Sequence, residues 1–165
     1  MKPLCKYIDH TVLKPEATPA AIEKICAEAL ENNFAAVCIN PCHIELAKRL
    51  LAGSEVKVAT VIGFPLGANT TASKAFEARD AAARGADELD MVLNIGMLKA
   101  GAYDYVREDI HAVVEASGGK TVKVIFENCL LTEAEKIAAT QLSCEAGANY
   151  VKTSTGFNKS GATVE

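Results

Sequence analysis

Short apolar runs alternate with amphipathic stretches along the whole chain. Six of these runs have the length of strands, and several are apolar at nearly every position, which is typical of parallel strands covered on both faces. Between the runs, apolar residues recur at helical spacing. The pattern predicts strands near residues 7–11, 34–39, 56–63, 87–93, 121–127 and 150–152.

Polar residues and glycines indicate where the predicted helices begin and end. Thr18 followed by Pro19 is typical of an N-cap and the first helical position. Thr132 with Glu135 three residues later has the pattern of a capping box. A further helix is expected to open within residues 161–165. The alternation of strands and helices predicts a parallel α/β fold, formed by residues 1–165 as a single domain.

A doubly wound sheet and a (β/α)8 barrel both fit this alternation. The barrel is favoured because polar residues lie at or near the carboxyl ends of the strands, where barrel active sites are built. These residues are Asp9, Asn40, Asp90, Glu127 and Lys152. No G-x-G-x-x-G follows the first strand, so a dinucleotide cofactor is not indicated. A closed barrel needs eight units in about 250 residues, so six units predict a partial barrel.

Composition narrows the class of protein. The chain has 165 residues, of which 50% are hydrophobic, and a net charge of −4 without a basic run. This charge argues against nucleic acid as a partner, and no apolar run is long enough to cross a membrane. The six cysteines lie mostly in apolar segments, which is typical of buried thiols in a reducing compartment. We therefore expect a soluble cytoplasmic protein.

Lys152 stands in the short strand at residues 150–152, immediately before a polar turn. Burial disfavours a charged ammonium, and a neutral amine is a nucleophile toward carbonyls. Lys152 is therefore either a Schiff-base lysine or a strand-end lysine that reaches solvent. Asp90 lies in an apolar strand, where it is either salt-bridged to a lysine or a catalytic acid. Alternate barrel strands share an interior layer, so Lys152 and Asp90 are expected to face each other, as imine formation and C–C cleavage require.

Other polar positions are weaker candidates. Thr153 to Gly156 can cradle a phosphate, although such turns also form for local backbone bonding alone. Cys38, Cys42 and His43 have a superficially metal-like spacing, but without a second cluster we predict no metal site. Among the residues near strand entries, Lys57 and Lys123 are expected at the surface with packed stems, and Asp87 and Glu88 are expected to be solvated.

Six segments of the chain resemble deoxyribose-phosphate aldolase, collinearly from near the N-terminus to the last residue. The segment that carries Lys152 is highly specific to that family. The segments are IDHTVLKPEAT (8–18), AAVCINP (35–41), KVATVIGFPLGA (57–68), GADELDMVLNIGMLK (85–99), VKVIFENCLLT (122–132) and GANYVKTSTGF (147–157).

The resemblance implies a metal-independent class I aldolase on a (β/α)8 barrel, with no cofactor. Such an enzyme reversibly cleaves 2-deoxy-D-ribose 5-phosphate, a small phosphorylated sugar, to acetaldehyde and D-glyceraldehyde 3-phosphate. It implies that Lys152 forms the Schiff base, that Asp90 transfers protons, and that Gly156 contacts the phosphate through its backbone. Cys38 matches a cysteine near the substrate, and Thr153 lies in the same substrate-binding turn as Gly156.

The chain also departs from the family pattern. A second active-site lysine on a seventh strand, and most of the phosphate site, have no counterpart in these residues. The alternative hypothesis is therefore an impaired or inactive aldolase fragment that acts only as a folding or assembly unit. A transaldolase is disfavoured by the GFPLGA and VKTSTGF segments.

An incomplete barrel should also affect assembly. Six strands cannot close a barrel of this geometry, so the strands around Ile8 and Val151 are expected to be open edges. We expect a homo-oligomer, a dimer or larger. Five strand residues are expected to lose part of their packing: Cys38, Val58, Ile62, Val92 and Ile125.

Overall fold

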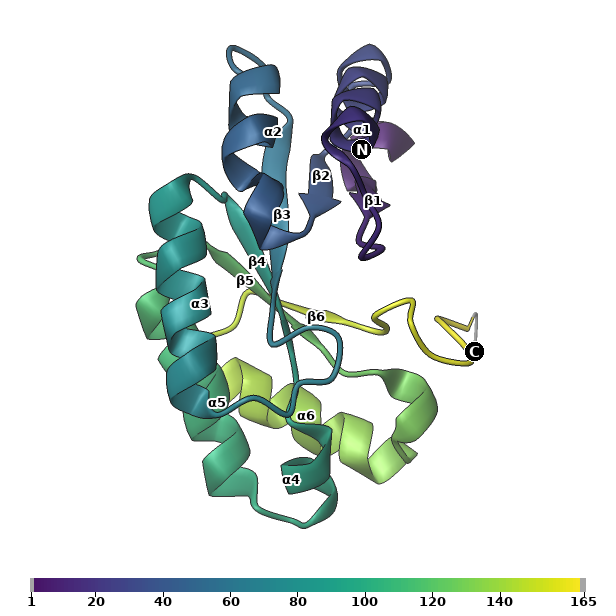
Figure 1. Ribbon diagram of the computed structural model, residues 1–165. Helices are drawn as coiled ribbons and strands as arrows, with labels where there is room; N and C mark the ends of the chain where they lie inside the picture. Colours follow the sequence, from purple (N-terminus) through teal and green to yellow (C-terminus); the bar gives the residue numbers. More distant parts are fainter. Residues whose placement is uncertain (1, 164–165) are drawn as a thin grey trace. The chain divides into compact units, whose positions relative to one another are not determined.

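A computed structural model describes residues 2–163 of the chain. These residues form two compact units (Figure 1). Within the described residues, the first comprises residues 2–61 and Ala81–Glu88, and the second comprises Ile62–Asp80 and residues 89–163. The prediction of a single domain stays a prediction.

The first unit is a parallel sheet with two α-helices. In order it contains the 3-10 helix η1 (Leu4–Tyr7), β1 (Asp9–Val12), α1 (Pro19–Glu31), β2 (Ala36–Ile39), the 3-10 helix η2 (Pro41–His43), α2 (Ile44–Leu50) and β3 (Lys57–Ile62). Strand β2 pairs in parallel with both β1 and β3, and all four of its residues are buried. Helix α1 packs against α2, β1 and β2.

Helix α1 begins where the sequence predicts. The Thr18 hydroxyl accepts a hydrogen bond from the Ala21 N–H at 3.4 Å, and Pro19 occupies the first helical position. The buried face of the helix repeats every three or four residues, as an amphipathic helix requires. Its buried side chains are Ile22, Ile25, Cys26 and Ala29.

The second unit alternates helices with three strands in the order β4-β5-β6. It contains α3 (Thr71–Arg84, whose last turn belongs to the first unit), β4 (Glu88–Val92), α4 (Ile95–Lys99), α5 (Tyr103–Ala116), β5 (Thr121–Ile125), the 3-10 helix η3 (Asn128–Leu130), α6 (Glu133–Glu145) and β6 (Tyr150–Lys152). Strands β5 and β6 are parallel, with Ile125 opposite Lys152. Helix α5 packs against α4, α6 and β5. The predicted capping box of α6 is confirmed, because Thr132 and Glu135 bond each other's backbone N–H.

A buried ion pair joins three elements of the second unit. Lys74 of α3 is fully buried, and its Nζ lies 2.5 Å from Asp109 Oδ2 of α5. The same ammonium donates to the Val92 carbonyl at the end of β4, at 3.0 Å. Thr71 donates its hydroxyl to the second oxygen of Asp109 at 2.8 Å. The pair therefore fixes α3 and α5 against the carboxyl end of β4.

The helix expected to open within residues 161–165 is absent at residues 161–163, and residues 164–165 lie outside the described part of the chain. The expectation that five strand residues lose part of their packing is wrong. The five strand residues expected to lose packing are each at most 2% exposed. At Val92 the reason is visible: a Cβ placed on Gly67 would lie 2.9 Å from Val92 Cγ1, so the loop after β3 covers β4. The exposed apolar strand residues are instead Tyr150 (63%) and Val151 (48%) of β6.

Candidate active site

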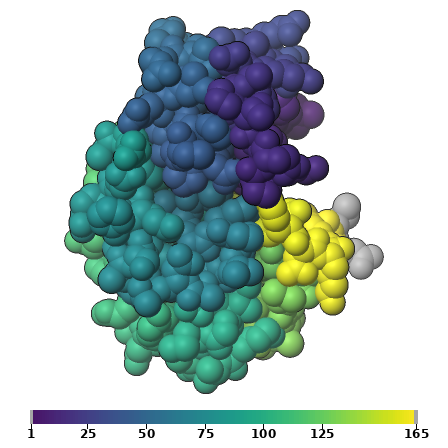
Figure 2. Space-filling view, in the orientation of Figure 1, coloured from purple at the N-terminus to yellow at the C-terminus, as the bar shows by residue number. Residues whose placement is uncertain are grey.

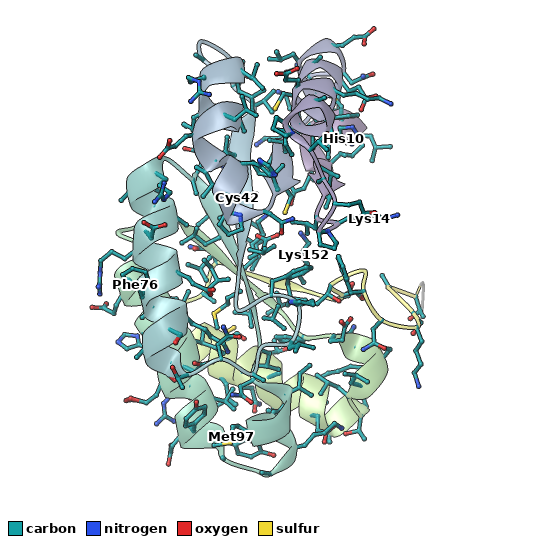
Figure 3. All side chains as sticks on the ribbon, viewed as in Figure 1. His10, Lys14, Cys42, Phe76, Met97 and Lys152 are labelled. Carbon is teal, nitrogen blue, oxygen red and sulfur yellow. The ribbon has the colours of Figure 1, made fainter. Side chains whose placement is uncertain are left out.

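Lys152 and Asp90 form the centre of the candidate site. Lys152 is the last residue of β6, and its Nζ lies 2.6 Å from Asp90 Oδ2 of β4. The Asp90 side chain is fully buried, whereas the Lys152 side chain is 33% exposed. Figure 3 labels Lys152 among the side chains around β6. The predicted pairing of these two residues is therefore present, with the amine accessible and the carboxylate enclosed.

Lys123 is the residue that the sequence interpretation placed wrongly. Its side chain is 10% exposed rather than at the surface, and its Nζ lies 3.3 Å from Asp90 Oδ1. Alternation along β5 puts Lys123 on the same face as Ile125, and Ile125 is the register partner of Lys152. The long lysine side chain then reaches along the sheet to the carboxylate. This face relationship is the signal that could have identified Lys123.

Asp90 thus lies between two ammonium groups, one at each carboxylate oxygen. The contact to Lys152 has hydrogen-bond geometry, whereas Asp90 Oδ1 accepts no hydrogen bond among the described residues. Lys123 Nζ and Asp90 Oδ1 form an ion pair, because at 3.3 Å the two charges interact strongly. Two amines therefore compete for one buried carboxylate.

The turn after Lys152 is held by an acidic residue from the end of β5. Glu127 is 3% exposed, and its carboxylate accepts hydrogen bonds from the Thr155 N–H at 3.2 Å and from the Thr155 hydroxyl. Thr153 and Gly156, the other predicted substrate contacts in this turn, are exposed. The Phe157 ring packs edge-on against Phe64, with centroids 5.2 Å apart. Figure 2 shows the segment that follows, in yellow, at the surface.

The remaining candidates lie in the first unit. Cys38 is 1% exposed within β2. Cys42 is an exposed thiol. Across residues 2–163 there is no group of three or more His, Cys, Asp or Glu side chains arranged to hold a metal ion.

The charged residues around the start of β3 and β4 form ion pairs. Lys57, with its side chain 52% exposed, lies 2.8 Å from Glu88, which confirms its surface position. Asp87 accepts hydrogen bonds from Lys48 Nζ at 3.0 Å and from the Val58 N–H at 3.0 Å. Asp87 and Glu88 are therefore partly buried ion-pair partners, and the prediction that they are simply solvated is wrong. The Val58 N–H of β3 offers Asp87 a donor that water would otherwise supply.

Residues 4–165 match the sequence profile described as DeoC/LacD family aldolase. The chain belongs to this family. A curated relative from Clostridium perfringens, named deoxyribose-phosphate aldolase, is 66% identical over 163 residues, which are 98% of this chain and 73% of that protein.

Solved structures extend the family match to the fold. A proposed deoxyribose-phosphate aldolase from Coccidioides immitis superposes with a TM-score of 0.95 and 46% identity, over 97% of this chain and 63% of that one. A deoxyribose phosphate aldolase from Aeropyrum pernix, described as tetrameric, has a TM-score of 0.84 and 32% identity, over 94% of this chain and 66% of that one. The predicted α/β fold of the (β/α)8 barrel family is confirmed, with six strands in the described residues. None of the helices within residues 2–163 has the length and apolar character needed to cross a membrane.

Proposed function

We propose that this DeoC/LacD family member is a class I aldolase that reversibly cleaves 2-deoxy-D-ribose 5-phosphate to acetaldehyde and D-glyceraldehyde 3-phosphate. The observation that carries the proposal is the 2.6 Å contact between the accessible amine of Lys152 and the buried carboxylate of Asp90. The names of the relatives supply the substrate, and the chain spans 73% of the Clostridium relative's length.

In the cleavage direction, the neutral Lys152 amine attacks the C1 aldehyde carbon and forms a carbinolamine. Loss of water gives a protonated imine, which draws electron density from the C2–C3 bond. Removal of the C3 hydroxyl proton breaks that bond, releasing D-glyceraldehyde 3-phosphate and leaving an enamine. Protonation of the enamine carbon and hydrolysis then release acetaldehyde and regenerate the amine. Asp90 is placed beside the amine to carry protons in these steps.

Lys123 supplies a second cation to the same carboxylate. Its contact with Asp90 Oδ1 leaves Asp90 shared between two amines, so Lys152 does not hold the carboxylate alone. A shared counter-ion favours proton release from one of the two amines. We assign Lys123 this electrostatic role and Lys152 the nucleophilic one, because Lys152 has the more exposed side chain.

Substrate binding is assigned to the turn after Lys152. We propose that Gly156, through its backbone, and Thr153 contact the phosphate, and that Cys38 lies near the substrate. The chemistry proposed for these side chains requires no cofactor or metal.

We also propose that the protein works as a homo-oligomer in the cytoplasm. The Aeropyrum relative is described as tetrameric, and the six cysteines of this chain form no disulfide, as in a reducing compartment.

The decisive experiment is trapping of the imine. The chain is incubated with acetaldehyde and borohydride, and the reduced adduct is mapped by mass spectrometry. We expect a single ethyl adduct at Lys152 that is lost in Lys152→Ala and retained in Lys57→Ala, a variant of the exposed lysine paired with Glu88. Adducts spread over surface lysines, unchanged by Lys152→Ala, would contradict the proposal. They would instead favour a fragment that folds and assembles without catalysis.

A further inference from the structure

Glu127 has an unusual backbone conformation for its residue type. Its φ of 58° and ψ of 63° lie in the left-handed region, which residues with a Cβ rarely adopt. Its side chain is also buried, and a buried carboxylate requires hydrogen-bond donors. Strained residues of this kind persist where surrounding contacts hold them, and they cluster at functional sites. The contacts of Glu127 therefore indicate which part of the structure depends on its conformation.

Among the described residues, the hydrogen bonds to the Glu127 carboxylate come from Thr155. One oxygen accepts the Thr155 N–H at 3.2 Å, and the other accepts the Thr155 hydroxyl. The hydroxyl oxygen in turn accepts the Phe157 N–H at 3.1 Å. Thr155 is 8% exposed, so this relay is shielded from water. The carboxylate thus fixes both Thr155 and Phe157.

The backbone on either side of Glu127 is bonded to the same segment. The Phe126 N–H donates to the Lys152 carbonyl at 2.9 Å, and the Asn128 N–H donates to the Thr153 carbonyl at 2.8 Å. Residues 126–128 therefore hold the chain from Lys152 to Phe157 at several successive points. Between the fixed positions stands Gly156, with φ 80° and no heavy atom within 4 Å of a Cβ placed on it. Hydrogen bonds therefore hold both ends of the turn, and the space beside Gly156 is not filled by other atoms.

We propose that Glu127 is a positioning residue that holds the turn Thr153–Phe157 in the conformation that receives the substrate phosphate. It acts through Thr155 and touches no reacting atom. Because Gly156 offers only its backbone, its ability to bind an anion depends on the conformation that the neighbouring residues impose. Glu127 consequently sets the preference for a phosphorylated over an unphosphorylated sugar. This inference rests on the proposed function.

The test compares kcat/KM for 2-deoxyribose 5-phosphate with kcat/KM for 2-deoxyribose. In Glu127→Gln, an NH2 donor replaces one of the two carboxylate oxygens, so the Thr155 donor that this oxygen accepts loses its partner. We expect the ratio of the two kcat/KM values to fall at least ~10-fold, mainly through the KM of the phosphorylated sugar. The kcat/KM for 2-deoxyribose and the yield of the trapped acetaldehyde adduct at Lys152 should stay within about threefold of the wild type.

A second pair of variants covers the case in which Glu127→Gln fails to fold. Thr155→Val removes the hydroxyl with little change of shape and should lower the ratio as Glu127→Gln does. Thr155→Ser keeps the hydroxyl and should preserve the ratio. Glu133→Gln is the matched control, because Glu133 is 78% exposed on α6 and pairs with Lys136. It should leave both substrates unaffected.

The outcomes separate this inference from the proposed function. An unchanged ratio in Thr155→Val and Glu127→Gln, with the Lys152 adduct present, would overturn this inference alone. Equal losses on both sugars would also overturn it, since they would indicate a general structural role. A wild-type chain without preference for the phosphorylated sugar would do the same. Absence of the Lys152 adduct in the wild type would overturn the proposed function and this inference with it.

Discussion

Lys123 Nζ lies 3.3 Å from Asp90 Oδ1, while Lys152 Nζ lies 2.6 Å from the other oxygen of the same carboxylate. Asp90 is fully buried, so each ammonium acts on it with little screening by solvent. The two lysines come from neighbouring strands, β5 and β6. Loss of either lysine therefore changes the charge beside the same buried carboxylate.

Removing Lys123 should reduce catalysis without removing the nucleophile. Lys123→Met leaves Asp90 with Lys152 as its remaining close ammonium, which then holds its proton more firmly. We expect kcat/KM for 2-deoxyribose 5-phosphate to fall by about 10- to 100-fold, as for loss of one charged contact of about 1.5–3 kcal/mol. Lys123→Arg, which keeps the charge, should retain more activity. Steady-state kinetics with a melting curve for each variant measures this. Full activity of folded Lys123→Met would contradict the electrostatic role.

The absolute rate should be low. Residues 1–165 span 73% of the Clostridium relative, and the family resemblance implies a second lysine and most phosphate contacts outside the segments matched here. Remote phosphate contacts normally supply binding energy that orients the reacting atoms. We expect turnover at least ~10³-fold below that of a complete relative, since each lost interaction of about 1.4 kcal/mol lowers the rate tenfold. A side-by-side assay decides this, and a rate within tenfold would show that the present contacts suffice.

The Lys74–Asp109 pair should be costly to break on one side. Both side chains are buried, so Lys74→Met leaves the Asp109 charge and the Val92 carbonyl without their ammonium partner. We expect a loss of about 3–5 kcal/mol in the free energy of unfolding, measured by urea titration. The double variant Lys74→Met/Asp109→Leu should recover much of it. Lys99→Met, which removes an ammonium 43% exposed beside Glu135, is the control and should cost less than about 1 kcal/mol. Equal effects at Lys74 and Lys99 would contradict the assignment.

Stability should fall in acid partly through the capping box of α6. The backbone N–H of Thr132 holds the pKa of Glu135 below its usual value, and Lys99 adds to the effect. A carboxylate with a lowered pKa in the folded state stabilises the fold above its unfolded pKa, and this contribution disappears as the pH falls through the folded value. Glu135→Gln should remove this part of the decrease in the free energy of unfolding at low pH. Thr132→Ser, which keeps the cap hydroxyl, should retain it. Urea midpoints from pH 6 to pH 3 are the measurement, and parallel profiles for wild type and Glu135→Gln would contradict it.

Local signals in the sequence predict where helices and strands begin and end. Of the site residues, the sequence predicts those whose partners lie on strands of the regular βα repeat. The caps at Thr18 and Thr132 are encoded within four residues, so they were predictable. The Asp90–Lys152 pair was predictable because alternate strands of a barrel contribute side chains to the same interior layer. Lys123 was misplaced because a lysine near a strand entry usually reaches solvent, and the reach of its side chain depends on the tertiary neighbour Asp90. The sequence places Glu127 near the carboxyl end of a strand, but it does not predict its left-handed φ or its contact with Thr155, 28 residues away.

Assembly is the last property that the strands predict. Strand β6 is the final strand of the order β4-β5-β6, and Tyr150 and Val151 expose 63% and 48% of their surfaces. An exposed strand with apolar side chains pairs readily with another chain, whereas a charged residue on it opposes pairing. We therefore expect a dimer or larger species at micromolar concentration, measured by light scattering behind a sizing column.

The matched variants decide whether β6 is the surface that associates. Val151→Lys should shift the population toward monomer because the added charge would have to be buried between chains. Ile137→Lys changes a similarly exposed apolar residue on α6, 54% exposed, and should leave the oligomer intact. A compact wild-type monomer that melts cooperatively would contradict the prediction. Dissociation by Ile137→Lys but not by Val151→Lys would move the interface to α6 and leave the β6 edge without a role in assembly.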